Sequence, residues 1–140
     1  MSAELYQYGN GDSSYQAAGG FTGLTTLVNA FYDYMDSLPE ATVIRKMHSA
    51  DLTLPRKKLT YFLSGWLGGP RIYNEHFGSI HIPGAHAHFP IGHAERDAWM
   101  LCMQKAVAEQ PYEESFKAYL LAQLQFPAEK IRQTCSHFQP

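Results

Sequence analysis

Hydrophobic residues recur at steps of three and four along most of the chain, which is the period of an α-helix with one buried face. The first such stretch predicts a helix over residues 22–37, and Leu38 and Pro39 follow it directly. Its apolar positions are Leu24, Leu27, Val28, Phe31, Met35 and Leu38. Because proline disfavours helical geometry in the residue before it, Pro39 predicts the end of this helix. A short connecting helix is predicted over residues 41–48.

A second apolar stripe predicts a helix that begins near Thr53, a plausible N-cap, with Pro55 in its first turn. The stripe consists of Leu59, Phe62, Leu63, Trp66 and Leu67. These positions follow the spacing i, i+3, i+4, i+7 and i+8, so one helical face is apolar throughout. The following Gly-Gly-Pro at residues 68–70 predicts an abrupt end.

Two further helices are predicted in the C-terminal half of the chain. One covers residues 93–109, and the other opens at Pro111 and runs to about Leu124. Pro127 is expected to interrupt the second, with a final short turn over residues 128–134. Since no stretch alternates as a strand does, the predicted fold class is all-α.

Residues 71–91 lack a sustained period and contain two glycines and two prolines, which predicts a long irregular loop with short helical pieces. Long loops in compact domains are usually functional. This one holds four of the seven histidines, namely His76, His81, His86 and His88. Imidazole nitrogen is a good ligand for iron, zinc or copper, but histidines in loops are more often simply exposed to solvent. The histidines of this loop are therefore compatible both with a metal site and with a solvent-exposed loop that binds nothing.

Composition and charge narrow the functional classes. The chain has 140 residues, of which 45% are hydrophobic and 17% are charged, with a net charge of −2. The length and the hydrophobic content suit one domain with a buried hydrophobic core. The slightly negative net charge provides no positively charged surface for binding nucleic acid or a membrane. The polar N-terminus has no signal peptide pattern, and no run approaches the ~20 apolar residues of a membrane span. A cytoplasmic protein is expected, with Cys102 as a core thiol.

Three side chains combine an apolar body with a polar tip and have no obvious partner nearby in the sequence. They are Tyr32 on the first long helix, His48 at the end of the connector and Trp99 on the third long helix. Each could be a core residue whose polar atom makes a hydrogen bond within the protein. Together they would also suit a pocket that holds a polar diatomic ligand.

Several segments in a fixed order resemble the group II truncated haemoglobins. They are WLGGPRIY at residues 66–73, AHAHFPI at 85–91 and ERDAWMLCM at 95–103, together with the Gly19-Gly20 and Phe31-Tyr32 pairs. The resemblance covers roughly residues 15–126. It implies a two-over-two helical sandwich around haem b, with a long irregular loop before the proximal histidine. We expect a flexible N-terminal arm over residues 1–15, the globin domain over 16–126 and a C-terminal extension over 127–140.

The resemblance also implies roles for individual residues. His86 would be the proximal iron ligand, and His88 a neighbour that does not bind iron. Tyr32, His48 and Trp99 would lie on the distal side as the candidate catalytic residues. The remaining haem-binding positions would be Pro55, Lys58, Leu59, Phe62, Leu63, Tyr73, Phe89, Ile91 and Met103, with Lys58 pairing a haem propionate.

This sequence departs from the family pattern at three positions. His48 stands where the family usually has tyrosine or phenylalanine, and Pro55 where it often has a small residue. Ala85 replaces a commonly basic residue, which implies the loss of one propionate contact.

The function implied is the binding of O₂, NO, CO or peroxide, with NO dioxygenase-like or peroxidase-like detoxification as the expected use. His48 or Tyr32 would be candidates for internal ligation of ferric iron, and a separate reductase would restore ferrous iron. A monomer or weak homodimer is expected. One alternative is an O₂ carrier or sensor without turnover. Another, from a different class, is a non-haem helical binding module whose histidine loop binds zinc.

Overall fold

The computed structural model describes residues 8–78 and 91–136, and this part of the chain is helical and contains no strand. The elements in chain order are α2 (Ser13–Ala17), α3 (Gly20–Ser37), the 3₁₀ helix η1 (Pro39–Ala41), α4 (Thr42–Lys46), α5 (Thr53–Trp66), α6 (Ile72–Phe77), α8 (His93–Ala108) and α9 (Glu114–Ser136). The predicted all-α fold class is confirmed.

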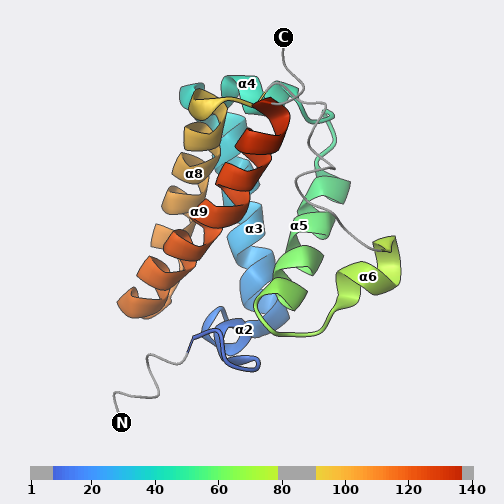
Figure 1. Cartoon of the computed structure of the whole chain (residues 1–140), viewed down its shortest axis with the longest axis vertical. Helices are drawn as coiled ribbons and strands as arrows, with labels where there is room; N and C mark the ends of the chain where they lie inside the picture. The colour runs from blue at the N-terminus through green and yellow to red at the C-terminus, as the bar shows by residue number, and fades with distance from the viewer. Residues whose placement is uncertain (1–7, 79–90, 137–140) are drawn as a thin grey trace.

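Helix α3 lies at the centre of the described part of the molecule, between α5 and α8. It packs against α5 on one side and against α8 on the other, while α9 packs along α8 (Figure 1). The short helix α6 lies against α5, away from the α8–α9 pair. Two long helices therefore face two others, as the two-over-two prediction requires.

The core forms where the predicted apolar stripes meet. On α3 the buried positions are Leu24, Leu27, Val28, Phe31, Tyr32 and Met35. On α8 and α9 they are Ala98, Met100, Cys102, Met103, Ala106, Val107, Phe116, Leu120, Leu124 and Ala128. Full burial of one large apolar side chain contributes roughly 1.5–3 kcal/mol, so these stripes supply most of the force that holds the helices together. Cys102 is fully buried, which confirms its prediction as a core thiol.

Helix α9 passes through Pro127 instead of stopping there, so the predicted interruption is wrong. Proline removes one backbone hydrogen bond, but the residues on both sides of it are held by tertiary contacts. Leu124 and Ala128 are buried in the core, and Glu129 accepts a hydrogen bond from Arg96 of α8 at 2.6 Å. This packing outweighs the local cost, and the first part of the predicted C-terminal extension continues the helix.

The described part of the predicted N-terminal arm, from residue 8 onward, is packed against the helices. The hydroxyl of Tyr8 lies 2.8 Å from Ser115 Oγ at the start of α9. The backbone N–H of Tyr15 donates to the carbonyl of Leu67, just beyond α5, at 3.1 Å. The polar composition of residues 1–15 predicts flexibility, but two aromatic anchors fix this part of the segment.

The remaining helix ends differ from their predictions by a few residues. Helix α5 begins at Thr53 itself, and Asp51 accepts hydrogen bonds from the Thr53 backbone N–H at 2.9 Å and its hydroxyl at 2.7 Å. Helix α9 begins at Glu114, three residues after Pro111. Among the described helices, none has the length and apolar character needed to cross a membrane.

Candidate functional site

The three predicted distal residues come together around one aromatic cluster. Phe31 packs edge-on against Tyr32 at 4.9 Å and against Trp99 at 5.1 Å, measured between ring centroids. The imidazole of His48 lies edge-on to Tyr32, with centroids 5.8 Å apart. Residues from α3, from α8 and from the segment after α4 therefore share a single cluster. The fold thus brings Tyr32 and Trp99 to the same Phe31 ring, although the two residues lie 67 positions apart in the sequence.

The orientation of His48 fixes which of its nitrogens is available. Its Nδ1 lies 2.9 Å from the backbone oxygen of Ile44, one helical turn earlier. A carbonyl oxygen can only accept, so Nδ1 must carry the hydrogen. In the neutral ring, Nε2 is then a bare lone pair, which can accept a hydrogen bond or bind a metal but cannot donate. Neutral His48 therefore cannot donate to a ligand through Nε2, and only the protonated ring can do so.

Tyr32 is buried at the α3–α5 interface, with only 6% of its surface exposed. Burial raises the pKa of its phenol to about 12, and the positive charge of Arg56 partly opposes this rise. The phenol is therefore neutral at physiological pH and keeps its O–H as a donor. Among the described residues, neither the Tyr32 hydroxyl nor the Trp99 indole N–H has a hydrogen-bond partner.

Helix α5 supplies an apolar wall beside this cluster. Leu63 is fully buried, whereas Leu59, Phe62 and Trp66 are only half-buried, and all belong to one stripe. Phe62 and Trp66 stack on each other with centroids 6.0 Å apart. Pro55, near the start of the helix, is also half-buried. Large apolar side chains left partly uncovered on one helical face are suited to contact a flat apolar ligand.

The other predicted haem-binding positions lie in three different environments. Lys58 is exposed, and its Nζ lies 5.4 Å from the centre of the Phe77 ring. Tyr73 on α6 and Ile91 before α8 are half-buried. Met103 has no exposed surface and lies in the core. Met103, like Leu63, can therefore support a ligand-binding wall but presents no free surface to a ligand.

The predicted proximal side of the site lies outside the described residues. This applies to the proposed ligand His86 and to Phe89, as well as to His81 and His88. Within residues 8–78 and 91–136, no group of three or more histidine, cysteine, aspartate or glutamate side chains could hold a metal ion.

The described residues fit the haem group that the resemblance implies. A porphyrin needs a broad apolar contact surface, and the half-buried side chains of α5 provide one. A gas ligand on the distal side needs nearby polar groups, and the cluster brings together three side chains with polar tips. Two of these tips, on Tyr32 and Trp99, have no described partner to compete with a ligand. The apolar face of α5 thus suits the porphyrin, and the polar groups of Tyr32, His48 and Trp99 suit a ligand on the iron, as a ligand-binding haem pocket requires.

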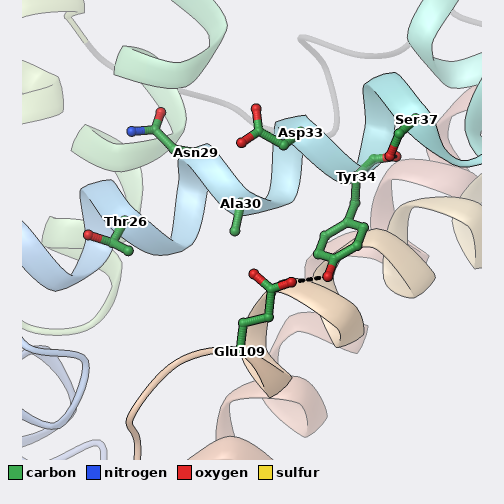
Figure 2. A pocket seen from close by; sticks show the side chains of 7 residues that line it. All are labelled: Thr26, Asn29, Ala30, Asp33, Tyr34, Ser37 and Glu109. Atoms are coloured by element: carbon green, nitrogen blue, oxygen red, sulfur yellow. Dashed lines mark hydrogen bonds between the residues drawn. The ribbon is translucent and has the colours of Figure 1, made fainter.

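A separate hollow of about 440 Å³ lies on the outer side of α3, toward the end of α8 (Figure 2). Its lining residues are Thr26, Asn29, Ala30, Asp33, Tyr34, Ser37 and Glu109. The Tyr34 hydroxyl donates to Glu109 across it, and this bond raises the pKa of Tyr34. None of these residues belongs to the predicted site.

Arg56, a residue that no sequence motif singles out, contacts Tyr32 directly. Its guanidinium carbon lies 5.7 Å from the centre of the Tyr32 ring. The only signal in the sequence is its position on the helix that was expected to line the haem. The two residues lie 24 positions apart in the sequence, so their contact arises only when α3 and α5 pack together.

Comparison with known proteins agrees with this geometry. The family model for bacterial-like globins matches residues 13–133. The group 2 truncated hemoglobin YjbI of Bacillus subtilis (strain 168) is 32% identical over 105 residues, which cover 75% of this chain and 77% of that protein.

Solved structures show the same relationship in three dimensions. The group II 2-on-2 hemoglobin of Agrobacterium tumefaciens has a TM-score of 0.81 and 36% identity, covering 85% of this chain and 92% of that one. A truncated oxygen-avid haemoglobin from Bacillus subtilis has a TM-score of 0.77 and 31% identity, covering 84% and 97%. The chain therefore belongs to the bacterial-like globin family, as a group II truncated haemoglobin with a haem-iron cofactor and the O₂-binding chemistry of globins.

Proposed function

We propose that this globin holds O₂, NO, CO or peroxide in a distal pocket formed by Tyr32, His48 and Trp99, and that it detoxifies nitric oxide or peroxide. The observation that carries the proposal is the cluster around Phe31, whose ring lies within 5.1 Å of both Tyr32 and Trp99. When bound, haem supplies a redox-active iron with one coordination position for an external ligand. The proximal ligand in this proposal is His86.

The distal residues supply different hydrogen-bonding groups. Tyr32 keeps its proton because burial raises its pKa to about 12, so it donates at neutral pH. The indole N–H of Trp99 can only donate. His48 offers a bare Nε2 when neutral, because Nδ1 is bonded to Ile44. A ligand that gains negative charge would thus meet two donors and one group able to accept or carry a proton.

The wall of the haem pocket is proposed to consist of Pro55, Leu59, Phe62, Tyr73, Phe89 and Ile91, with Leu63 and Met103 supporting it from the core. Burial of their apolar surface supplies much of the free energy of haem binding. Lys58 is proposed to pair a propionate, which its exposed position permits. Turnover would need an external reductase, and we expect a monomer or weak homodimer.

An O₂ carrier or sensor without turnover is the alternative within this family. Two or three neutral hydrogen bonds of about 0.5–1.5 kcal/mol each would slow O₂ release by roughly tenfold or more, which disfavours simple storage. The Bacillus subtilis structure is described as that of an oxygen-avid haemoglobin, and this supports retention of O₂ here. The zinc-binding helical module is disfavoured because the globin family model covers residues 13–133.

The test is the rate of O₂ dissociation from the ferrous holoprotein in Tyr32→Phe and Trp99→Phe. Each variant removes one donor, so we expect O₂ to leave about fivefold to tenfold faster. Tyr61→Phe is the matched control, because its ring contacts Phe21, His76 and Phe77 and not the distal cluster. Unchanged O₂ dissociation rates in both distal variants would show that neither Tyr32 nor Trp99 donates a hydrogen bond to the ligand, and would contradict the proposed pocket.

A further inference from the structure

Arg56 connects α5 to the turn of α3 that carries Tyr32. Its Nη1 donates to the backbone oxygen of Asn29 at 3.0 Å and to Asn29 Oδ1 at 3.2 Å. Its Nη2 donates to Asp33 Oδ1 at 2.9 Å, which also makes an ion pair. Figure 2 shows Asn29 and Asp33 one turn apart and pointing to the same side of α3. The two anchors thus hold the guanidinium in one orientation.

This anchored guanidinium lies over the face of the Tyr32 ring, 5.7 Å from its centre. Tyr32 comes three residues after Asn29 and one before Asp33, so both anchors flank it on the same helix. A cation over an aromatic face is attracted to the ring, and the planar guanidinium is well suited to this contact. Arg56 therefore limits how the buried ring can tilt or withdraw without itself bonding to the hydroxyl.

We propose that Arg56 is a positioning residue for the distal tyrosine, an inference that rests on the proposed role of Tyr32 as a donor to the haem ligand. Arg56 fixes the spacing between α3 and α5 at this turn and holds the ring against Phe31. Its positive charge also draws electron density toward the ring face, which makes the phenol O–H a stronger donor. The effect on a bound gas is transmitted entirely through Tyr32.

The experiment combines Arg56→Met and Tyr32→Phe, singly and together, in the holoprotein. The readouts are the O₂ dissociation rate and the C–O stretching frequency of the ferrous CO form, which rises when a distal donor weakens. Arg56→Met should speed O₂ release by a factor of about five and raise the stretching frequency. In the Tyr32→Phe background the same substitution should change neither quantity, because the residue through which it acts is gone.

Lys57→Met is the matched control for loss of charge. Lys57 is the neighbouring residue on α5, but its Nζ lies over Tyr61 at 6.0 Å and not over Tyr32. We expect Lys57→Met to leave the CO stretching frequency unchanged. Equal shifts in Lys57→Met and Arg56→Met would show a diffuse charge effect and overturn the positioning role.

A second pair of variants covers the case in which Arg56→Met does not fold. Asp33→Ala keeps the arginine but releases one anchor, so it should shift the CO stretching frequency in the same direction by less. Asp36→Ala on the same helix breaks a comparable ion pair with Arg45 at 2.9 Å and should not shift it.

The outcomes separate this inference from the proposed function. If Tyr32→Phe changes both readouts while Arg56→Met and Asp33→Ala change neither, the positioning role is wrong and the donor role stands. The positioning role also fails if Arg56→Met has the same effect with and without Tyr32. If Tyr32→Phe itself changes nothing, the proposed donor function fails instead.

Discussion

At the scale of single residues, the two polar neighbours Tyr32 and His48 differ in their readiness to bind ferric iron. His48 has a bare Nε2 because Nδ1 donates to Ile44, so its lone pair is available in the neutral ring. Tyr32 would first have to lose a proton, and burial raises its pKa to about 12. We therefore predict that ferric holoprotein without an external ligand is largely low-spin near pH 7, and that His48→Phe makes it high-spin while Tyr32→Phe does not.

Absorption and electron paramagnetic resonance spectra of the ferric forms measure this change directly. Adding imidazole to the His48→Phe variant serves as the control, because an external nitrogen ligand should restore the low-spin spectrum. A low-spin spectrum that persists in both His48→Phe and Tyr32→Phe would exclude internal ligation by either residue. A low-spin spectrum lost only in Tyr32→Phe would assign the ligand to the phenolate instead.

At the scale of elements, the end of α5 is shaped by a close approach to the N-terminal segment. A Cβ atom at Gly69 would overlap the ring of Tyr15, which is held there by its backbone bond to Leu67. We predict that Gly69→Ala lowers the free energy of unfolding by about 1–3 kcal/mol, because the ring must move out of its packing. Thermal or urea unfolding followed by circular dichroism measures the change.

Gly65→Ala, one turn earlier in α5, is the matched control for this prediction. Its new methyl group would lie at an ordinary distance of 3.4 Å from the Cα of Arg71. Alanine is favoured over glycine inside a helix by about 1 kcal/mol, so this variant should be as stable as the wild type or more so. If Gly69→Ala were equally well tolerated, residues 8–15 would not be packed as the structure has them.

The elements that could be predicted from the sequence are those whose stability is local. The stripe from Leu24 to Met35 predicts α3 because one helical face alone explains it. The path of α9 could not be predicted, since Pro127 opposes the helix locally and only contacts such as Glu129 with Arg96 keep it helical. Long-range packing of this kind leaves no period in the sequence.

The candidate site follows the same division. Tyr32 and Trp99 can be singled out in the sequence because each has an apolar body with a polar tip on a predicted helix, and the resemblance implies a distal position for both. Neither the bond that orients His48 nor the contact of Arg56 with Tyr32 could be predicted. Both depend on where a nitrogen lies relative to a neighbouring carbonyl or ring, and only the folded chain fixes this.

At the scale of the whole molecule, one carboxylate joins the last helix to the rest of the fold. Glu129 accepts hydrogen bonds from Arg132 at 2.5 Å and from Arg96 on α8 at 2.6 Å. These two guanidinium groups, that of Arg132 above all, hold the pKa of Glu129 well below its usual range. The charged carboxylate of Glu129 therefore helps to hold the part of α9 beyond Pro127 against α8, beside the buried Ala128.

The lowered pKa fixes the pH dependence of this attachment. A carboxylate with a pKa lower in the folded than in the unfolded state stabilises the fold above its unfolded pKa of about 4.3, and the stabilisation is lost as the pH falls through the folded value.

We predict that Glu129→Gln melts at a lower temperature than the wild type by a constant difference between pH 6 and pH 8. Below about pH 4 the difference should shrink, because the unfolded wild-type chain then binds a proton at Glu129 that the folded carboxylate does not yet bind. Glu114→Gln is the control, since its ion pair with Lys117 involves a carboxylate that is 88% exposed and should contribute little at any pH. A melting difference for Glu129→Gln that is the same at pH 3 as at pH 7 would mean that the side chain acts through its shape and not through its charge. The ion pair with Arg96 would then not hold α9 against α8.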